Sequence, residues 1–463
     1  MIFIVKLKIT SVIYITFLYT FKNTLHKMDS QILDALVNKK NIAISGPGGV
    51  GKTYQINRIR EYCEQENIKY HVCASTGIAA VLIGGSTVHH WAGIKPYMIE
   101  KFQKGEFNII VNWRKESTKR VLKTNLLIID ELSMIGKSFF ELLDLYCRKI
   151  KKRDEPFGGI QLIVSFDMLQ LSPVKDDYVF NSPVWEKLDF TTVYFTKTFR
   201  TSDERFFELL SRARVGKLNK EDVEILKTRV NATNTSFEKQ GILPTILYCH
   251  KVNVDKINFD EISKLPGPFY NYKCKDTLYK NEIDITPTYT DQPQEVMEYF
   301  EETRLLMNTS VPDEIFLKPK SQVMLTMNLS VEKGLVNGSR GVIVSCDKEG
   351  VVIRFCDKLV NIFIGYSDFE YTDPITKIKF VRSHIPLQLS WSISTHKSQG
   401  QSLDYAKLDL GKNIFCAGQA YVALSRMRSL EGMILMSFDE KKVYASEEAL
   451  DFDESIRAVE KTE

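Results

Sequence analysis

The sequence has few features that would hold the chain together covalently or around a metal ion. Its 8 cysteines are scattered over 463 residues, with no Cys-x-x-Cys pair and no Cys/His cluster at the spacing of zinc ligands. Such a distribution is typical of reduced thiols inside a cell rather than of a disulfide framework. We therefore predict no disulfide, no structural metal and an intracellular location.

The chain also lacks a strong net charge and a long apolar run. The formal net charge is +4, so charge alone neither requires nor excludes a nucleic-acid partner. Residues 1–27 contain no Asp or Glu, but Lys6 and Lys8 confine the apolar stretch to Ile9–Phe21, shorter than the ~20 residues of a membrane span. We expect this segment to be an unstructured extension or, alternatively, a targeting peptide, without stable membrane association.

What the sequence does contain is organised around a P-loop. Four residues that suit a buried strand, Ile42–Ser45, run into a Gly-x-x-x-x-Gly-Lys-Thr motif, and a helical pattern follows. In such a loop the backbone N–H groups face a polyphosphate, the lysine reaches the terminal phosphates and the hydroxyl ligates Mg²⁺. An ordinary glycine turn before a helix is the alternative, although both flanking elements lie where nucleotide binding requires them. The residues predicted to bind ATP and its Mg²⁺ are Gly46, Gly49, Gly51, Lys52 and Thr53.

A second motif, Leu126–Ile135 with the sequence LLIIDELSMI, supplies acidic side chains. Its apolar run predicts a buried parallel strand, which places Asp130 and Glu131 at the carboxyl end, where α/β sheets bind their ligands. We expect Asp130 to hold the Mg²⁺ and Glu131 to orient and deprotonate the attacking water. A solvated acidic pair is the alternative, but these two carboxylates directly end an apolar strand.

Further motifs make the pattern specific to one family. Residues 74–80 read ASTGIAA and residues 84–93 read GGSTVHHWAG; towards the end, residues 394–400 read STHKSQG and residues 419–426 read QAYVALSR. In this order with the P-loop and the acidic motif, they resemble the petite-integration-frequency (PIF) DNA helicases, a branch of superfamily 1 type B. The similarity covers roughly residues 31–435. The compact form is like that of family members from large DNA viruses.

The third motif of that family departs from its usual pattern here. Residues 167–174 read DMLQLSPV and retain the polar Asp167 and Gln170, and residues 198–200 provide the family's arginine, Arg200. The departures are Phe166 for glycine, Met168 for phenylalanine, Ser172 for proline and Thr201 for glutamine. We therefore expect a changed loop shape rather than changed chemistry.

The resemblance implies an α/β fold of two RecA-like P-loop domains with parallel sheets, plus a small β-barrel inserted in the second. The short alternating strands that follow residue 341 favour such a barrel. The expected parts are an extension at 1–27, a first domain at 28–189 with a small insertion at about 94–121, a second domain at 190–435 with the barrel at about 341–384, and an acidic C-terminal tail at 436–463.

The resemblance also implies roles for single residues. Gln31 would read the adenine, Gln170 would sense the γ-phosphate, and Gly400 would join the nucleotide-binding set. Arg200 and Arg426 would neutralise charge on the transferring phosphoryl group, unless each forms a structural salt bridge instead. The expected DNA contacts are Thr76, His89, Thr395 and His396. The histidines 89 and 90 and Trp91 could alternatively form a core cluster.

Together these features predict an ATP-dependent DNA helicase that moves 5′→3′ on single-stranded DNA and unwinds duplex in replication, repair or recombination. The polarity rests on the resemblance alone. A single-strand translocase without strand separation and a P-loop ATPase acting on protein are the alternatives. We expect single-stranded and forked DNA as partners, and a monomer, or a dimer on DNA. We expect a location at DNA in the nucleus or a viral replication site, with the mitochondrion as alternative.

Overall fold

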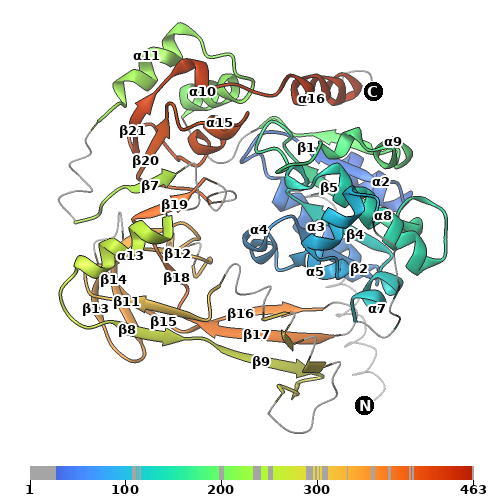
Figure 1. Cartoon of the computed structure of the whole chain (residues 1–463), viewed down its shortest axis with the longest axis horizontal. Coiled ribbons are helices and arrows are strands. Elements are labelled where there is room, and N and C mark those ends of the chain that lie inside the picture. The colour runs from blue at the N-terminus through green and yellow to red at the C-terminus, as the bar shows by residue number, and fades with distance from the viewer. Residues whose placement is uncertain are drawn as a thin grey trace, which may run out of the picture.

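The computed structural model describes residues 28–460 with internal gaps (Figure 1). The predicted extension at 1–27 and three predicted site residues, Arg200, His396 and Gly400, lie outside the described residues. The internal gaps are 107–110, 112, 114–115, 198–202, 233–240, 249–253, 288–295, 298–299, 302, 305–310, 331, 356–359, 374–376, 396–397 and 399–400. No helix in the described part of the chain is both long enough and apolar enough to span a membrane.

The first half of the chain forms a six-stranded parallel sheet in the order β3-β2-β4-β5-β1-β6. Its central strands are buried along almost their whole length, as a sheet covered on both faces requires. The strands are β1 (Ile42–Ser45), β2 (Tyr70–Ala74), β3 (Ser86–Thr87), β4 (Leu126–Asp130), β5 (Gln161–Phe166) and β6 (Thr191–Tyr194).

Helices cover both faces of this sheet, because alternate residues of each strand enter different cores. In β4, Leu127 and Ile129 pack with Phe140 of α8, whereas Leu126 and Ile128 pack with Ile59 of α3. The helices of this half are α2 (Ser30–Val37), α3 (Lys52–Gln65), α4 (Gly77–Leu82), α5 (Val88–Ala92), α6 (Pro96–Gln103), α7 (Glu116–Lys123), α8 (Lys137–Lys151) and α9 (Pro183–Lys187).

The second half contains a further parallel sheet, in the order β19-β7-β20-β21. The prediction of an α/β fold with parallel sheets is thus confirmed. The strands are β7 (Thr245–Tyr248), β19 (Ser392–Ser394), β20 (Ala406–Leu410) and β21 (Met433–Phe438). The helices around them are α10 (Glu204–Arg214), α11 (Lys220–Thr228), α13 (Val254–Lys264) and α15 (Gln419–Leu424).

The predicted small β-barrel at about 341–384 is not confirmed. The described strands of that range divide between two open antiparallel sheets, because strands before and after it complete the pairing. One sheet has the order β15-β14-β13-β12-β18, with β12 (Gln322–Leu325), β13 (Arg340–Cys346), β14 (Gly350–Phe355), β15 (Asn361–Gly365) and β18 (Leu387–Leu389). The other has the order β10-β9-β17-β16, with β9 (Lys275–Lys280), β10 (Ile283–Asp284), β16 (Ser367–Thr372) and β17 (Ile378–His384). A separate pair is formed by β8 (Tyr270–Lys273) and β11 (Glu314–Leu317).

The domain boundaries differ from the predicted ones at two places. The expected boundary at residue 190 falls before β6, yet β6 pairs with β1 and is the edge strand of the first sheet. Residues 436–463, expected to form an acidic tail, include the end of β21 and the helix α16 (Glu447–Glu460). This helix packs on the first domain, where the ring of Phe452 stacks on Phe180 with centroids 4.2 Å apart.

The antiparallel sheet that contains β16 and β17 reaches from the second half to the first domain (Figure 1). Asp373, directly after β16, lies 3.8 Å from Nε2 of His71 on β2 and 3.9 Å from a guanidinium nitrogen of Arg120 on α7. All three side chains are buried. Arg120 also donates hydrogen bonds to the carbonyls of His90 and Trp91. The two halves of the chain are therefore joined through this buried cluster.

This cluster predicts a loss of stability in mild acid. Burial lowers the pKa of His71 to about 4, with Arg120 adding to the effect and Asp373 opposing it, whereas an unfolded histidine titrates near 6.5. Because the pKa of His71 is lower in the folded state, its contribution to the free energy of unfolding is present above the unfolded pKa. That contribution is lost as the pH falls below about 6.5. At pH 5.5 one such histidine costs about 1.4 kcal/mol of unfolding free energy.

Urea denaturation at pH 7.5 and 5.5 checks this prediction. His71→Gln should reduce the acid-induced loss by about 1.4 kcal/mol relative to the parent protein. Burial also lowers the pKa of His384 to about 4. His384→Gln is therefore a matched variant, and it should reduce the acid-induced loss of unfolding free energy independently of His71→Gln. An unchanged pH dependence in His71→Gln would show that this imidazole is not held neutral in the fold.

Candidate nucleotide-binding site

The P-loop lies between the central strand β1 and the helix α3, and its glycines are required by the backbone. Gly51 precedes α3 with φ of 91°, in the left-handed region that favours glycine. At Gly46, with φ of 139°, a Cβ atom would lie 2.3 Å from the carbonyl oxygen of Phe195 after β6. The loop is thus held against the edge of the sheet, with its N–H groups at the start of a helix, an arrangement suited to anions.

Lys52 is the first residue of α3, and its side chain turns back over the loop. Its Nζ donates hydrogen bonds to the carbonyls of Gly46 at 2.5 Å and Pro47 at 2.9 Å. Burial lowers the pKa of Lys52, whereas the nearby charges of Asp167, Glu131 and Asp130 act in the opposite direction. A cation surrounded by carboxylates at a helix N-terminus is the expected partner of a terminal phosphate.

Thr53 and Asp130 come together from α3 and β4. The Thr53 hydroxyl donates to a carboxylate oxygen of Asp130 at 3.5 Å, and Asp130 also accepts from the Ser165 hydroxyl at 2.7 Å and from the N–H of Glu131 at 2.9 Å. Burial raises the pKa of Asp130, and these hydrogen bonds and the Lys52 charge oppose the rise. Two adjacent hard oxygen donors beside the P-loop lysine fit Mg²⁺, so these residues would hold the ion.

Glu131 turns the chain sharply away from the end of β4. Its φ of 54° is a left-handed conformation that is uncommon for a residue other than glycine, a kind of strain found at functional sites. Burial, followed by the charge of Asp130, raises the pKa of Glu131, whereas Lys52 and Arg426 lower it. A carboxylate with a raised pKa is suited to accept a proton from water.

The second half of the chain contributes side chains to the same place. The hydroxyl of Tyr421 on α15 accepts a hydrogen bond from the N–H of Gly48 in the P-loop at 3.1 Å. The charge of Arg426 acts on Glu131 across the junction, while its guanidinium donates to the carbonyl of Val422 at 3.0 Å and to the Ser425 hydroxyl at 2.8 Å. Arg426 is buried, so its position is set by α15.

Gln170 lies in the loop after β5, close to these groups. Its side-chain amide donates to Asp167 at 3.1 Å, and both residues are buried. Gln31 lies in the first turn of α2 with an exposed side chain, and its backbone N–H is capped by Asp29. The backbone N–H of Asp29 in turn donates to Gln55 of α3 at 3.3 Å. The start of α2 is therefore fixed to the helix that follows the P-loop.

The predicted DNA contacts occupy different local settings. Thr76 is half-buried after β2 and accepts from the N–H of Ala79, and His89 on α5 stacks on Phe139 with centroids 4.2 Å apart. Burial lowers the pKa of His89 to about 4, so its ring is neutral at physiological pH.

Thr395 is buried after β19 and donates to the carbonyl of Tyr248 at 3.2 Å. Trp91 is fully buried in the core of the first domain, as the alternative interpretation expected.

Three polar residues of the site were not singled out by sequence reasoning. Tyr421 lies inside the motif at residues 419–426, so its hydroxyl could have drawn attention, whereas Ser165 lies two residues before the motif at 167–174. Arg214 ends the amphipathic helix α10 and gave no signal, because a basic residue in the last turn of a helix is usually an ordinary capping charge. In the structure it donates two hydrogen bonds to Asp167.

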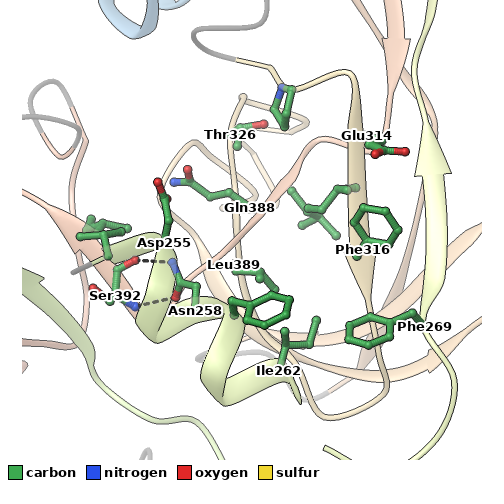
Figure 2. A pocket seen from close by; sticks show the side chains of 16 residues that line it. Asp255, Asn258, Ile262, Phe269, Glu314, Phe316, Thr326, Gln388, Leu389 and Ser392 are labelled. Atoms are coloured by element: carbon green, nitrogen blue, oxygen red, sulfur yellow. Dashed lines mark hydrogen bonds between the residues drawn. The ribbon is translucent and has the colours of Figure 1, made fainter. Parts of the chain in front are cut away.

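A separate pocket of about 610 Å³ lies between α13, β11 and the ends of β18 and β19. Figure 2 shows Asp255, Gln388 and Thr326 at one end and the rings of Phe269 and Phe316 at the other. The Asn258 amide hydrogen-bonds the backbone of Ser392 from both its oxygen and its nitrogen. The described residues that line this pocket include no Lys, Arg or His, so the pocket does not suit a polyphosphate.

Within the described residues, one group of possible metal ligands lies away from the P-loop. It comprises Cys274, Asp276 and Asp313. Arg382 pairs with both carboxylates, at 2.5 Å from Asp276 and 3.2 Å from Asp313, and is itself buried. The geometry is that of an ion-pair cluster around an arginine, and we assign no metal to it.

The fold and the site together define a P-loop nucleotide-binding protein with two RecA-like domains, in which the second domain contacts the nucleotide loop of the first. Residues 22–224 match the PIF1-like helicase family model, and residues 302–346 match the model of the DNA helicase Pif1 2B domain. The chain belongs to the PIF1-like helicase family.

Individual relatives agree with this assignment. The ATP-dependent DNA helicase PIF1 of Danio rerio is 36% identical over 447 residues, which cover 94% of this chain and 64% of that protein. The chain therefore spans less than two thirds of the length of that relative. Unliganded Pif1 from Bacteroides sp. is 25% identical with a TM-score of 0.71, covering 93% of this chain and 97% of that one. Bacteroides Pif1 bound to single-stranded DNA is also 25% identical, with a TM-score of 0.60 over the same shares.

Proposed function

We propose that the chain is an ATP-dependent DNA helicase that translocates 5′→3′ along single-stranded DNA and unwinds duplex. The observation that carries the proposal is the meeting of two domains at one phosphate-binding loop. Lys52, Thr53, Asp130 and Glu131 come from the first domain, and Tyr421 approaches from the second. A site shared by two domains can convert ATP binding and hydrolysis into domain movement.

The chemistry of the site follows from its residues. Lys52 would bind the terminal phosphates, and Glu131 would orient and deprotonate the attacking water. Thr53 and Asp130 would hold Mg²⁺, which when bound neutralises charge on the phosphates. Arg426, with Arg200 as a second candidate, would stabilise the charge of the transition state from the second domain. Gln31 would read the adenine, Gln170 would sense the γ-phosphate, and Gly400 would complete the nucleotide set.

DNA binding is proposed for four residues, two from each domain. Thr76 and His89 would grip the strand on the first domain, and Thr395 and His396 on the second. If the two grips alternate as the domains open and close, the strand moves in one direction. Support comes from a relative whose structure was determined with single-stranded DNA and from relatives named as DNA helicases. Replication, repair or recombination of DNA is the proposed setting, in the nucleus or at a viral replication site.

Two assays on the purified protein test this proposal. Single-stranded DNA should stimulate ATP hydrolysis, and a duplex with a 5′ single-stranded tail should be unwound faster than one with a 3′ tail. ATP hydrolysis that does not respond to DNA would favour an ATPase that acts on protein. Stimulated hydrolysis without strand displacement would favour a single-strand translocase, and preferred unwinding of the 3′-tailed duplex would reverse the proposed polarity.

A further inference from the structure

A buried arginine connects the nucleotide site to the C-terminal helix. Arg214, at the end of α10, is 1% exposed and lies between two carboxylates. Its Nε and one terminal nitrogen donate to the same oxygen of Asp167 at 3.0 and 2.8 Å. Its two terminal nitrogens donate to the two oxygens of Asp453 on α16 at 3.1 and 2.7 Å. One guanidinium thus holds together the loop after β5 and a helix from the far end of the chain.

The hydrogen bonds continue from Asp167 to the P-loop. The other oxygen of Asp167 accepts from the Gln170 amide at 3.1 Å and from the Tyr421 hydroxyl at 3.4 Å. The same hydroxyl accepts from the N–H of Gly48 at 3.1 Å. An uninterrupted line of polar contacts therefore runs from Asp453 through Arg214, Asp167 and Tyr421 to the P-loop.

The hydrogen bonds of the Arg214 guanidinium are complete only when α16 is in place. Burying a guanidinium is costly unless carboxylates and hydrogen bonds compensate it, and removing one partner leaves the rest uncompensated. Asp453 is itself fixed by Arg457 at 2.8 Å and by the Tyr194 hydroxyl at 3.3 Å. The charge of Arg214 lowers the pKa of Asp167 and so keeps this carboxylate ionised against the effect of burial.

The loop of Asp167 has little room to move independently of these contacts. A Cβ atom at Gly418, directly before α15, would lie 2.4 Å from the carbonyl oxygen of Gln170 and 2.6 Å from that of Leu169. The backbone of the second domain is therefore packed tightly on the loop. A shift of Arg214 would move Asp167, and with it Gln170 and the Tyr421 hydroxyl.

We propose that Arg214 is a positioning residue of the ATPase site and that α16 sets its position through Asp453, so that ATP turnover depends on the C-terminal helix. This inference rests on the proposed function. Arg214 would act through Asp167, which lies between it and the P-loop contact of Tyr421. The dependence is specific to Asp453, because the neighbouring Asp451 on the same helix is exposed.

The test compares Arg214→Lys and Asp453→Asn with Asp451→Asn as the matched control on the same helix. The readouts are the DNA-stimulated kcat per active site, the Kd of a fluorescent ADP analogue, which also counts the active sites, and the melting temperature. Arg214→Lys should lower kcat about 10²-fold, because a lysine cannot bridge Asp167 and Asp453 and a small misplacement is costly. Asp453→Asn should lower kcat by about 2- to 30-fold. Both should keep the Kd within about threefold, and Asp451→Asn should match the parent in every readout.

The double variant distinguishes one line of contacts from two independent effects. If Asp453 acts through Arg214, the double variant, Arg214→Lys with Asp453→Asn, should have a kcat only slightly lower than that of Arg214→Lys alone. A lower melting temperature with an unchanged kcat per active site would reduce Arg214 to a structural role and overturn the inference. A parent protein without DNA-stimulated hydrolysis would instead overturn the proposed function, and this inference with it.

Discussion

Glu131→Gln is expected to stop ATP hydrolysis while ATP and DNA remain bound. The amide keeps the shape of the side chain but cannot take the proton of the attacking water, and loss of a positioned base usually costs 10²–10⁴-fold in rate. The raised pKa of Glu131, caused first by its burial, makes proton transfer to this carboxylate favourable. Single-turnover hydrolysis and binding of a labelled single strand, both measured on the same preparation, check the result.

Lys52→Ala is the informative contrast to Glu131→Gln. Lys52 would contact the phosphates directly, so its removal should abolish nucleotide binding as well as turnover. Different effects on binding in the two variants would support the proposed division of roles. Turnover above about 1% of the parent rate in Glu131→Gln would mean that another group accepts the proton.

Arg426→Ala should lower the DNA-stimulated kcat by a factor on the order of 10³ and leave ATP affinity within a few-fold of the parent. An arginine from the second domain stabilises the transition state and can also link hydrolysis to domain movement. In the structure the charge of Arg426 lowers the pKa of Glu131. The Arg426 guanidinium itself donates hydrogen bonds to Val422 and Ser425 of its own domain. Measurement of kcat and the nucleotide Kd decides between an effect on turnover and one on binding.

Arg426→Lys serves as the control for charge alone. It should restore little activity, because an ammonium group cannot reproduce the planar fork that bridges two phosphate oxygens. A near-normal kcat in Arg426→Ala would show that the residue only holds α15 in place. The proposed role would then pass to Arg200, and the same pair of substitutions there would test it.

The local motifs could be predicted from the sequence because each combines a strand, a turn and a ligand side chain within a few residues. Gly51 and Asp130 are examples: the first precedes α3 and the second ends β4, as predicted. Strand pairing over long distances could not be predicted in the same way. The residues of β6 continue the first sheet beyond the expected boundary. Strand β17, which also pairs with β16, pairs with β9 about a hundred residues earlier instead of closing a barrel.

Contacts between the two halves were also beyond the reach of sequence reasoning. Neither Arg214 nor Asp373 lies in a recognisable motif, and each obtains its partners only after the chain has folded. Buried charges of this kind look like ordinary surface residues in a sequence. Their roles depend on three-dimensional neighbours, which local pattern does not encode.

The packing of α16 on the first domain has a consequence for biosynthesis. Chains are made from the N-terminus at about 5–20 residues per second, so roughly 250 residues and about 10–50 seconds separate β6 from the helix that covers it. Until then, the apolar surface formed by Phe166, Phe180 and Trp185, which Phe452 later covers, stays open to solvent on the nascent chain. The first domain is therefore expected to need protection by a chaperone during translation, and a ribosome that stalls before α16 would release an aggregation-prone product.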